Sequence, residues 1–247
     1  MRNKPTTFST PAEPRGDAAD ADLQAQEPGR RRRKEARPQE LIDAAMDLFV
    51  ERGFAGTRSE EVAKRAGVSK GTLYLYFPSK EDLFKAVVRT HLSAPIAEGQ
   101  ALADEFAGSS AELLRTLIQM LWHHVGHTAA GSICKVIMAE ARNFPDIAQF
   151  YVSEVIEPTH RLMAGALQRG IQRGEFRAVP VDHAVPALIA PALLLNMHKH
   201  SVGACPVCTH LSNDDDAAIR TQIDLILDGL QVRPGPPTSA PHAESPT

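Results

Sequence analysis

Residues 66–83 read AGVSKGTLYLYFPSKEDL and decide the fold. Just upstream, Val62 and Ala66 recur at helical spacing and predict the end of a short helix. Gly67 can take the left-handed conformation that closes a helix, and Ser69 can cap the start of the next one. Two helices joined by a turn of about four residues with a glycine form a helix-turn-helix, whose second helix enters the major groove of DNA. The stretch therefore predicts a DNA-binding protein.

Apolar, glycine and aromatic positions fall in register without a gap at Leu41–Ala45, Phe49, Gly53, Phe54, Thr57, Val62, Ala63, Ala66–Ser69, Gly71, Leu73, Tyr74, Tyr76, Phe77 and Ser79–Leu83. In these positions the sequence resembles the N-terminal domain of TetR-family transcriptional repressors. Two positions depart from the family pattern. Ser59 stands where the family usually has an apolar residue, and Glu60 stands where some members have an arginine that contacts DNA. The resemblance implies a three-helix DNA-binding domain, a larger ligand-binding domain and a homodimer.

The polar residues near the second helix predict the contacts with DNA. The N-terminal residues of a recognition helix reach base edges, and its free N–H groups attract phosphate. Gly71 lets the backbone approach the groove, and Thr72 offers a methyl or a hydroxyl group to a base edge. From these arguments and the resemblance, the candidate DNA-binding residues are Thr57, Arg58, Ser69, Lys70, Gly71, Thr72, Tyr74, Tyr76 and Lys80. The alternatives are that Tyr74 belongs partly to the core and that Lys80 is a solvated charge.

Charge is distributed unevenly along the chain. The net charge is -3, but residues 30–90 hold 14 Lys and Arg against 9 Asp and Glu, a balance of +5, which leaves -8 elsewhere. The run Arg30–Lys34 either lies on the DNA backbone or in a minor groove, or only adds non-specific affinity. The sequence has no apolar run of about 18 residues and no secretory signal, and its three cysteines form no disulfide framework. We expect a cytoplasmic protein without a membrane contact.

Helical periodicity predicts an all-α fold of about nine helices. Residues 1–29 and 233–247 hold hardly any large apolar groups and are predicted disordered tails. Between them we expect a basic arm and helix-turn-helix domain over 30–83, and a helical ligand-binding and dimerisation domain over 84–232. The first helix is predicted from Pro38 to Gly53, and capping patterns at Thr57-x-x-Glu60 and Ser79-x-x-Asp82 predict two further helix starts. Later helices are expected over 111–127, 130–143, 146–173, 182–202 and 214–231.

The last two helices carry apolar stripes that one chain could not easily bury. By resemblance to the family, these helices would pair with those of a second copy as a four-helix bundle. The stripes are Ala184, Leu188, Ala192 and Leu195, and Ile219, Ile223, Ile226, Leu227 and Leu230.

The family resemblance also implies a pocket among the middle helices for an apolar or amphipathic effector. Residues 131–158 resemble the C-terminal domain of regulators of multidrug efflux genes, which does not fix a ligand. Large apolar side chains and histidines supply the candidates, although each is individually more typical of plain core. The candidate ligand-binding residues are Phe106, Met120, Trp122, His123, His127, Met138, Phe150, His160 and Met163.

One cluster leaves its role open. His198, His200, Cys205, Cys208 and His210 have metal-ligating side chains, but their spacing matches no known zinc site over its whole length. A reversible redox pair and an ordinary loop are the alternatives. No enzyme motif is present, so neither catalysis nor a cofactor is expected. The sequence favours a ligand-responsive repressor that a small molecule releases from a palindromic operator. An activator stays open, and the rival is an interaction protein without specific readout.

Overall fold

The computed structural model describes residues 28–204 and 214–232. The chain divides into two compact units, residues 1–38 and 39–247, and the whole buried core belongs to the second. The side chains of the basic run, the predicted tails except Pro28 and Gly29, and Cys205, Cys208 and His210 lie outside the described residues. In the described part, no helix combines the length and the apolar character that a membrane crossing requires.

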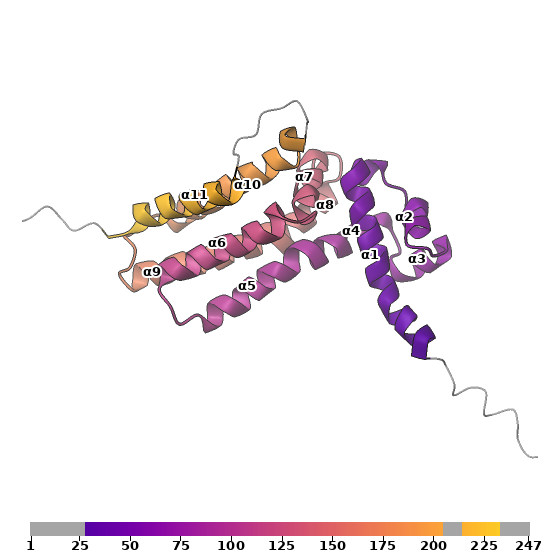
Figure 1. Cartoon of the computed structure of the whole chain (residues 1–247), viewed down its shortest axis with the longest axis horizontal. Coiled ribbons are helices and arrows are strands. Elements are labelled where there is room, and N and C mark those ends of the chain that lie inside the picture. The colour runs from indigo at the N-terminus through magenta and orange to yellow at the C-terminus, as the bar shows by residue number, and fades with distance from the viewer. Residues whose placement is uncertain (1–27, 205–213, 233–247) are drawn as a thin grey trace, which may run out of the picture. The chain divides into compact units, whose positions relative to one another are not determined.

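The described residues are almost entirely helical (Figure 1). The helices are α1 (Pro28–Gly56), α2 (Ser59–Arg65), α3 (Lys70–Tyr76), α4 (Lys80–Val88), α5 (Ala94–Glu105), α6 (Ser110–Gly126), α7 (Ala130–Glu140), α8 (Pro145–Tyr151), α9 (Glu157–Gln172), α10 (Val181–Lys199) and α11 (Asp215–Leu230). A first π-turn, Arg89–Ser93, joins α4 to α5, and a second, Val152–Ile156, joins α8 to α9. Counting each joined pair once, the described part has nine continuous helices, which confirms the all-α prediction.

The first helix differs from its prediction. The helix begins at Pro28, ten residues before the predicted start at Pro38, and Pro38 lies inside it. The predicted end is correct, because Gly53 has a φ of 73° and leaves the helical conformation. Only glycine adopts this backbone region without strain.

The predicted capping pattern at Thr57 is wrong. Helix α2 begins at Ser59, and its N-cap residue Arg58 makes no side-chain capping bond. The Thr57 hydroxyl instead donates to the carbonyl oxygens of Leu48 at 3.0 Å and Gly53 at 2.8 Å, and the residue is 1% exposed. Thr57 therefore fastens the end of α1 and does not open α2.

The turn between α2 and α3 forms as predicted. Gly67 has a φ of 66° and closes α2. The Ser69 hydroxyl accepts a hydrogen bond from the Thr72 amide at 3.1 Å and caps α3. Likewise, the Ser79 hydroxyl accepts from the Asp82 amide at 3.0 Å and caps α4. Each cap satisfies a helix N–H group that would otherwise have no partner.

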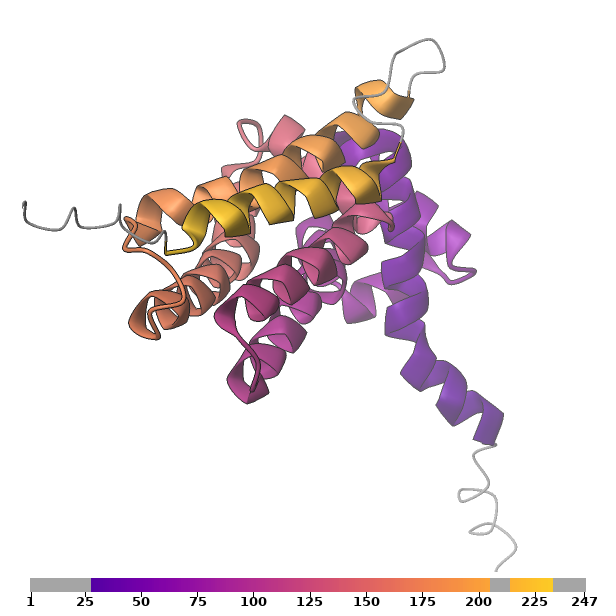
Figure 2. The same ribbon diagram turned by 60° about the vertical axis from the view of Figure 1, so that its left-hand side comes forward.

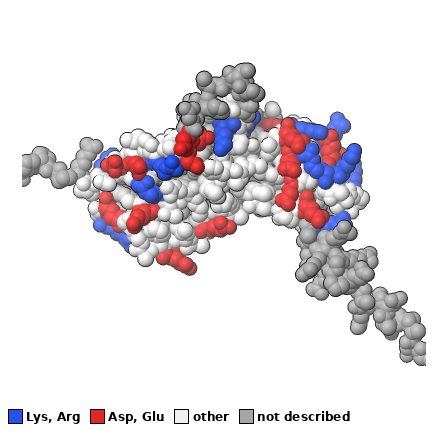
Figure 3. Space-filling view, viewed as in Figure 1, with Lys and Arg blue, Asp and Glu red and all other residues white. Residues whose placement is uncertain are grey.

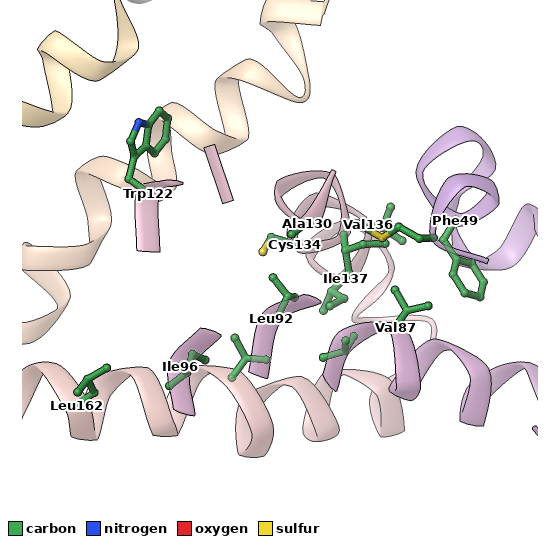
Figure 4. Close-up of a cluster of buried hydrophobic side chains, with 14 of the residues drawn as sticks. Phe49, Val87, Leu92, Ile96, Trp122, Ala130, Cys134, Val136, Ile137 and Leu162 are labelled. Atoms are coloured by element: carbon green, nitrogen blue, oxygen red, sulfur yellow. The ribbon is translucent and has the colours of Figure 1, made fainter. Parts of the chain in front are cut away.

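A continuous apolar cluster joins the N-terminal helices to the later ones (Figure 4). The Phe84 ring lies edge-on to Phe49 at 4.9 Å and to Phe54 at 5.1 Å between centroids. Phe54 also packs edge-on against Phe144 at 4.7 Å, just before α8. Both Glu140 carboxylate oxygens accept the Ala55 amide, at 3.1 and 3.2 Å. The end of α1 is thus tied to the end of α7.

Helices α10 and α11 run side by side (Figures 1 and 2). The residues predicted for their dimer stripes are mostly buried within one chain, so the expectation that one chain could not bury both stripes is wrong. The stripes face each other and α6, because α10 and α11 both pack on α6. The buried members are Leu188, Leu195, Ile219, Ile223, Leu227 and Leu230. Different apolar residues, Leu194 at 62% and Leu225 at 69%, are the exposed ones on these helices.

Candidate nucleic-acid interface and apolar cavity

Helix α3 presents a polar face to solvent. Leu73 is fully buried and anchors the helix, while Lys70, Gly71 and Tyr74 are exposed. The hydroxyl groups of Ser69 and Thr72 share a hydrogen bond of 2.8 Å, which holds both side chains at the start of the helix. The structure therefore brings together most of the predicted DNA-binding residues on one short exposed segment.

Lys70 connects this segment to α2. Its ammonium group pairs with a Glu60 carboxylate oxygen at 2.5 Å and lies 5.7 Å from the centroid of the Tyr74 ring. The hydrogen bond with Lys70 lowers the pKa of Glu60 and raises the pKa of Lys70, so both groups are ionised near neutral pH. Because both side chains are more than half exposed, water screens the pair, and a phosphate group can replace Glu60 at little cost.

Lysines, arginines and acidic residues alternate over the N-terminal helices (Figure 3). Two further ion pairs contribute to this pattern, Arg52 with Glu61 and Arg65 with Glu51, each at 2.6 Å. Three basic residues of the described helices, Arg52, Arg65 and Lys70, are therefore paired with neighbouring carboxylates.

Two predicted DNA-binding residues are directed elsewhere. The Thr57 hydroxyl is buried against backbone carbonyls, so the prediction that this side chain faces DNA is corrected. The Lys80 ammonium donates to the carbonyl oxygens of Phe54 at 2.8 Å and Thr57 at 3.2 Å, and lies 4.3 Å from the centroid of the Phe54 ring. Neither predicted alternative, a phosphate contact or a solvated charge, matches this placement of Lys80. Arg58 and Tyr76 remain exposed and partly exposed.

The sequence prediction missed Leu75. Its side chain is 77% exposed, next to Tyr74 on the recognition helix, although Leu73 two residues earlier is fully buried. Apolar side chains in the major groove contact the methyl group of thymine. The helical period was the available signal, because Leu75 falls off the face shared by Leu73 and Phe77.

A cavity of about 120 Å³, the inner cavity, lies among the later helices. The first π-turn, α5, α6, α7, α9 and α10 all contribute to it, and Trp122 and Met163 line it as predicted. Its walls are mainly apolar, and include Leu92, Ile96, Ile118, Leu121, Val125, Val155, Leu188 and Leu193.

A second hollow of about 320 Å³, the outer hollow, lies between α7, the second π-turn, α9 and α10. Two more predicted residues, Met138 and His160, line it. The inner cavity and the outer hollow share one wall, made by Tyr151, Val155, Thr159, Ile189 and Leu193.

Five predicted ligand-binding residues line neither hollow. Met120 packs against Gly99, and His123 is exposed beside His127. His127 lies 2.8 Å from an Asp216 carboxylate oxygen. The Phe106 carbonyl accepts from Arg169 at 2.9 Å. The Phe150 ring lies under the guanidinium of Arg89 at 4.9 Å. The prediction is corrected here, because helical spacing does not show which face of a helix meets a cavity and which meets a neighbouring helix.

The prediction missed several polar residues that line the inner cavity: His91, His124, Tyr151, Thr159 and Asn196. His91 lies on the first π-turn, where burial lowers its pKa, partly offset by the charge of Asp43, and its Nε2 atom is buried without a hydrogen-bond partner. Asn196 is 1% exposed; its Nδ2 group donates to the Gly131 carbonyl at 3.2 Å, but its Oδ1 atom has no partner. Burial raises the pKa of Tyr151 well above its usual value, so its phenol stays neutral. A histidine and an asparagine at ordinary helical positions carried no signal in the sequence.

Of the five residues in the predicted metal-ligating cluster, only His198 and His200 lie in the described part of the chain. Among the described residues, no three metal-ligating side chains come together. The Nδ1 atom of His200 lies 2.8 Å from the Ser132 hydroxyl, which ties α10 to α7.

Comparison with known proteins matches both regions. The family model "Bacterial regulatory proteins, tetR family" covers residues 41–87, and "Tetracyclin repressor-like, C-terminal domain" covers residues 104–202. The HTH-type transcriptional regulator RutR of Escherichia coli (strain K12) is 34% identical over 155 residues, which is 62% of this chain and 69% of the relative. The HTH-type transcriptional repressor KstR2 of Rhodococcus jostii (strain RHA1) is 27% identical over 80% of this chain and 92% of the relative.

Solved structures share the fold. The fatty acid degradation regulator FadR from Bacillus halodurans superimposes with a TM-score of 0.65 at 21% identity, over 79% of this chain and 97% of that chain. FadR from Bacillus subtilis in complex with stearoyl-CoA gives a TM-score of 0.62 at 20% identity, over 78% and 99% of the two chains. On its two matched regions and its relatives, the chain belongs to the TetR family of bacterial regulatory proteins.

Proposed function

We propose that the protein is a homodimeric transcriptional repressor that binds a palindromic operator and that a small-molecule effector releases from it. The observation that carries the proposal is the exposed face of α3, which is anchored by Leu73 and presents Lys70, Gly71 and Thr72 at its N-terminal end. This end of a recognition helix reads base edges in the major groove. The names of the relatives, HTH-type transcriptional regulator and repressor, support the same function.

One continuous helix supports coupling between the cavity and the DNA-binding helices. In α4, Leu83, Phe84 and Val87 are fully buried, and α4 continues through the first π-turn into α5. His91 and Leu92 of this turn line the inner cavity. A molecule in the cavity thus contacts the same continuous helix whose α4 part packs against the DNA-binding helices. We propose that binding displaces α4 and changes the spacing of the two recognition helices.

The dimer would form through α10 and α11. Their exposed apolar residues, Leu194 and Leu225, gain from burial against a second copy. Two recognition helices are also needed to bind two half-sites one helical turn apart. We place the protein in the cytoplasm, where it meets DNA.

An electrophoretic mobility assay on the intergenic DNA upstream of the coding gene tests the proposal. We expect one discrete complex that unlabelled operator removes and unrelated DNA of equal length does not. Fractions of extracted cellular metabolites are then added to the assay. We expect at least one fraction to abolish the complex. Failure to shift any fragment that carries an inverted repeat contradicts the proposal.

A further inference from the structure

We propose that the effector is an uncharged, mainly apolar molecule whose hydroxyl or carbonyl group forms a hydrogen bond with His91 at the inner cavity. The inference deepens the proposed function and rests on it, since it names the class of molecule that the same cavity takes.

The walls disfavour a charged ligand group. Among the described residues, none that lines the inner cavity or the outer hollow is Lys, Arg, Asp or Glu; the histidines there are His91 and His124 at the inner cavity and His160 at the outer hollow. A carboxylate or phosphate inside would lose its hydration without gaining an opposite charge, which strongly disfavours binding. The lining tyrosine, Tyr151, stays neutral because burial raises its pKa. The walls therefore select against ionised ligands.

A buried polar atom indicates that the molecule is not a pure hydrocarbon. His91 lines the inner cavity, and its Nε2 atom is buried without a hydrogen-bond partner among the described residues. Asn196 also lines the cavity, but its Oδ1 atom lies beside Gly131 of α7. Buried polar atoms in native proteins nearly always have a partner. A neutral imidazole can donate to a carbonyl or accept from a hydroxyl, depending on its tautomer. A ligand oxygen would satisfy His91 without introducing charge.

The dimensions limit the size of the molecule. An apolar cavity of about 150 Å³ holds benzene, so the inner cavity of about 120 Å³ accommodates roughly one ring. Since the outer hollow of about 320 Å³ shares a wall with it, a larger apolar group extends between α7 and α9. The site thus fits a compact neutral molecule of two or more rings, or a short branched chain.

His91 occupies the position from which a ligand can act on DNA binding. It belongs to the π-turn between α4 and α5, and π-turns within helices are frequent at functional sites. A hydrogen bond at His91 therefore pulls on the helix that continues into the DNA-binding domain. Apolar contacts deeper in the cavity supply affinity, while the hydrogen bond with His91 couples the ligand to the helix that continues into α4.

Two dyes with the same ring skeleton test the charge rule. N-phenyl-1-naphthylamine is neutral, and 8-anilino-1-naphthalenesulfonate differs from it by one sulfonate. In fluorescence titrations of the full-length protein, we expect the neutral dye to bind at least about tenfold more tightly. Equal or tighter binding of the sulfonate, or no binding of either dye, overturns the proposal.

Cavity variants locate the bound dye. Ala192 lines the inner cavity, so Ala192→Trp should abolish binding of the neutral dye, whereas Ala101→Trp on the exposed surface of α5 should leave it unchanged. Thr159 lines both hollows, so Thr159→Arg should shift the preference toward the sulfonate. Circular dichroism identifies a variant that does not fold. If one of the two cavity variants, Ala192→Trp and Thr159→Arg, fails to fold, the other still tests the site. Dye binding that neither substitution alters overturns the assignment to this site.

A second pair of probes tests the role of His91. 1-Naphthol and 1-methylnaphthalene have nearly the same shape, and only the first has a hydroxyl group. In competition with the neutral dye, we expect 1-naphthol to bind about three- to tenfold more tightly, and His91→Leu to remove that preference. A preference that persists in His91→Leu overturns the His91 contact.

These measurements require no DNA, so they separate the two proposals. A protein that follows the charge rule but binds no operator contradicts the proposed function alone. A protein that binds its operator but prefers the sulfonate contradicts the effector class alone.

Discussion

The helix-turn-helix carries several ion pairs, whereas none of the described residues that line the two hollows is Lys, Arg, Asp or Glu. On α2 and α3, Lys70 and Glu60 form an ion pair that water screens and that a phosphate can replace. The inner cavity instead combines mainly apolar walls with a few polar side chains, those of His91, His124, Tyr151, Thr159 and Asn196. The ion pairs lie where water reaches them, and the two hollows are lined mainly by apolar side chains. This difference fits the two proposed partners, DNA and an uncharged effector.

The largest expected effect separates reading DNA from folding. Outside its chain neighbours and the backbone of α3, a Cβ atom added at Gly71 meets only the Ser69 hydroxyl, at 3.8 Å, and the position is exposed, so the side chain of Gly71→Leu can point into solvent. We expect unchanged or slightly higher stability, since glycine disfavours helices. On the operator, the side chain should hold α3 away from the groove and reduce affinity about 100-fold, or about 2.7 kcal/mol. Gly165→Leu on α9, also in open space, is the control for both measurements. Full operator affinity in Gly71→Leu would mean that this end of α3 does not enter the groove.

The next effect tests how tightly the cavity region is packed. A Cβ group at Gly131 would overlap the Val125 carbonyl oxygen, Asn196 Oδ1 and His200 Nε2, and the carbonyl is backbone that cannot rotate away. Gly131→Ala should therefore lower the free energy of unfolding by about 2 kcal/mol. Gly165→Ala should raise it by about 0.5–1 kcal/mol, because that site is open. Urea unfolding measures the free energy of unfolding of both variants. A Gly131→Ala variant more stable than the unchanged protein would show that α7 and α10 pack loosely.

Lys80 and Lys70 are expected to differ: the first stabilises the fold, and the second contacts DNA. Lys80→Ala removes two hydrogen bonds to carbonyls at the end of α1 and should cost about 1 kcal/mol of stability. Lys70→Ala removes an exposed ion pair and a contact with the Tyr74 ring, so the stability should stay close to that of the unchanged protein. It should instead lower the salt dependence of operator binding by about one unit. If Lys80→Ala lowers that slope and leaves stability intact, Lys80 contacts phosphate as the sequence first indicated.

The smallest effect concerns pH. Burial lowers the pKa of His91 and of His200 in the folded protein. The unfolded chain then binds more protons below about pH 6.5, so stability is present above that pH and falls as the solution becomes more acidic. Thermal midpoints at pH 7.5 and 5.5 should differ, and His91→Gln should reduce the difference. The carboxylates with lowered pKa values, such as Glu60, titrate below this window. An unchanged difference in His91→Gln would mean that His91 is not desolvated.

The same contrast explains what the sequence could predict. The helix-turn-helix is contiguous, so Gly67, Ser69 and Ser79 announced their turns and caps through spacing alone. Thr57 misled the prediction because a capping pattern does not show that a hydroxyl turns inward to Leu48. Lys80 misled it for a similar reason, since Phe54 lies 26 positions away in sequence.

The cavity could be predicted only in part. Large apolar residues such as Trp122 and Met163 were identified because they are rare and lie on inward faces. His91 and Asn196 are far apart in the chain and become neighbours of one cavity only through tertiary packing. The prediction that one chain could not bury both apolar stripes was wrong for the same reason. Leu188 and Ile223 are buried within one chain, and the helical period alone does not show which surface covers a stripe.

Fluorescence anisotropy on a selected operator tests the central claim most directly. The operator is obtained by repeated selection from random duplexes, and a scrambled duplex of the same composition serves as reference. The account predicts that affinity for both duplexes falls as salt rises, while the operator stays at least about 1,000-fold preferred, because base contacts and not phosphate contacts carry specificity. A preference that disappears as salt rises, or that Gly71→Leu leaves untouched, would contradict a sequence-reading role for α3.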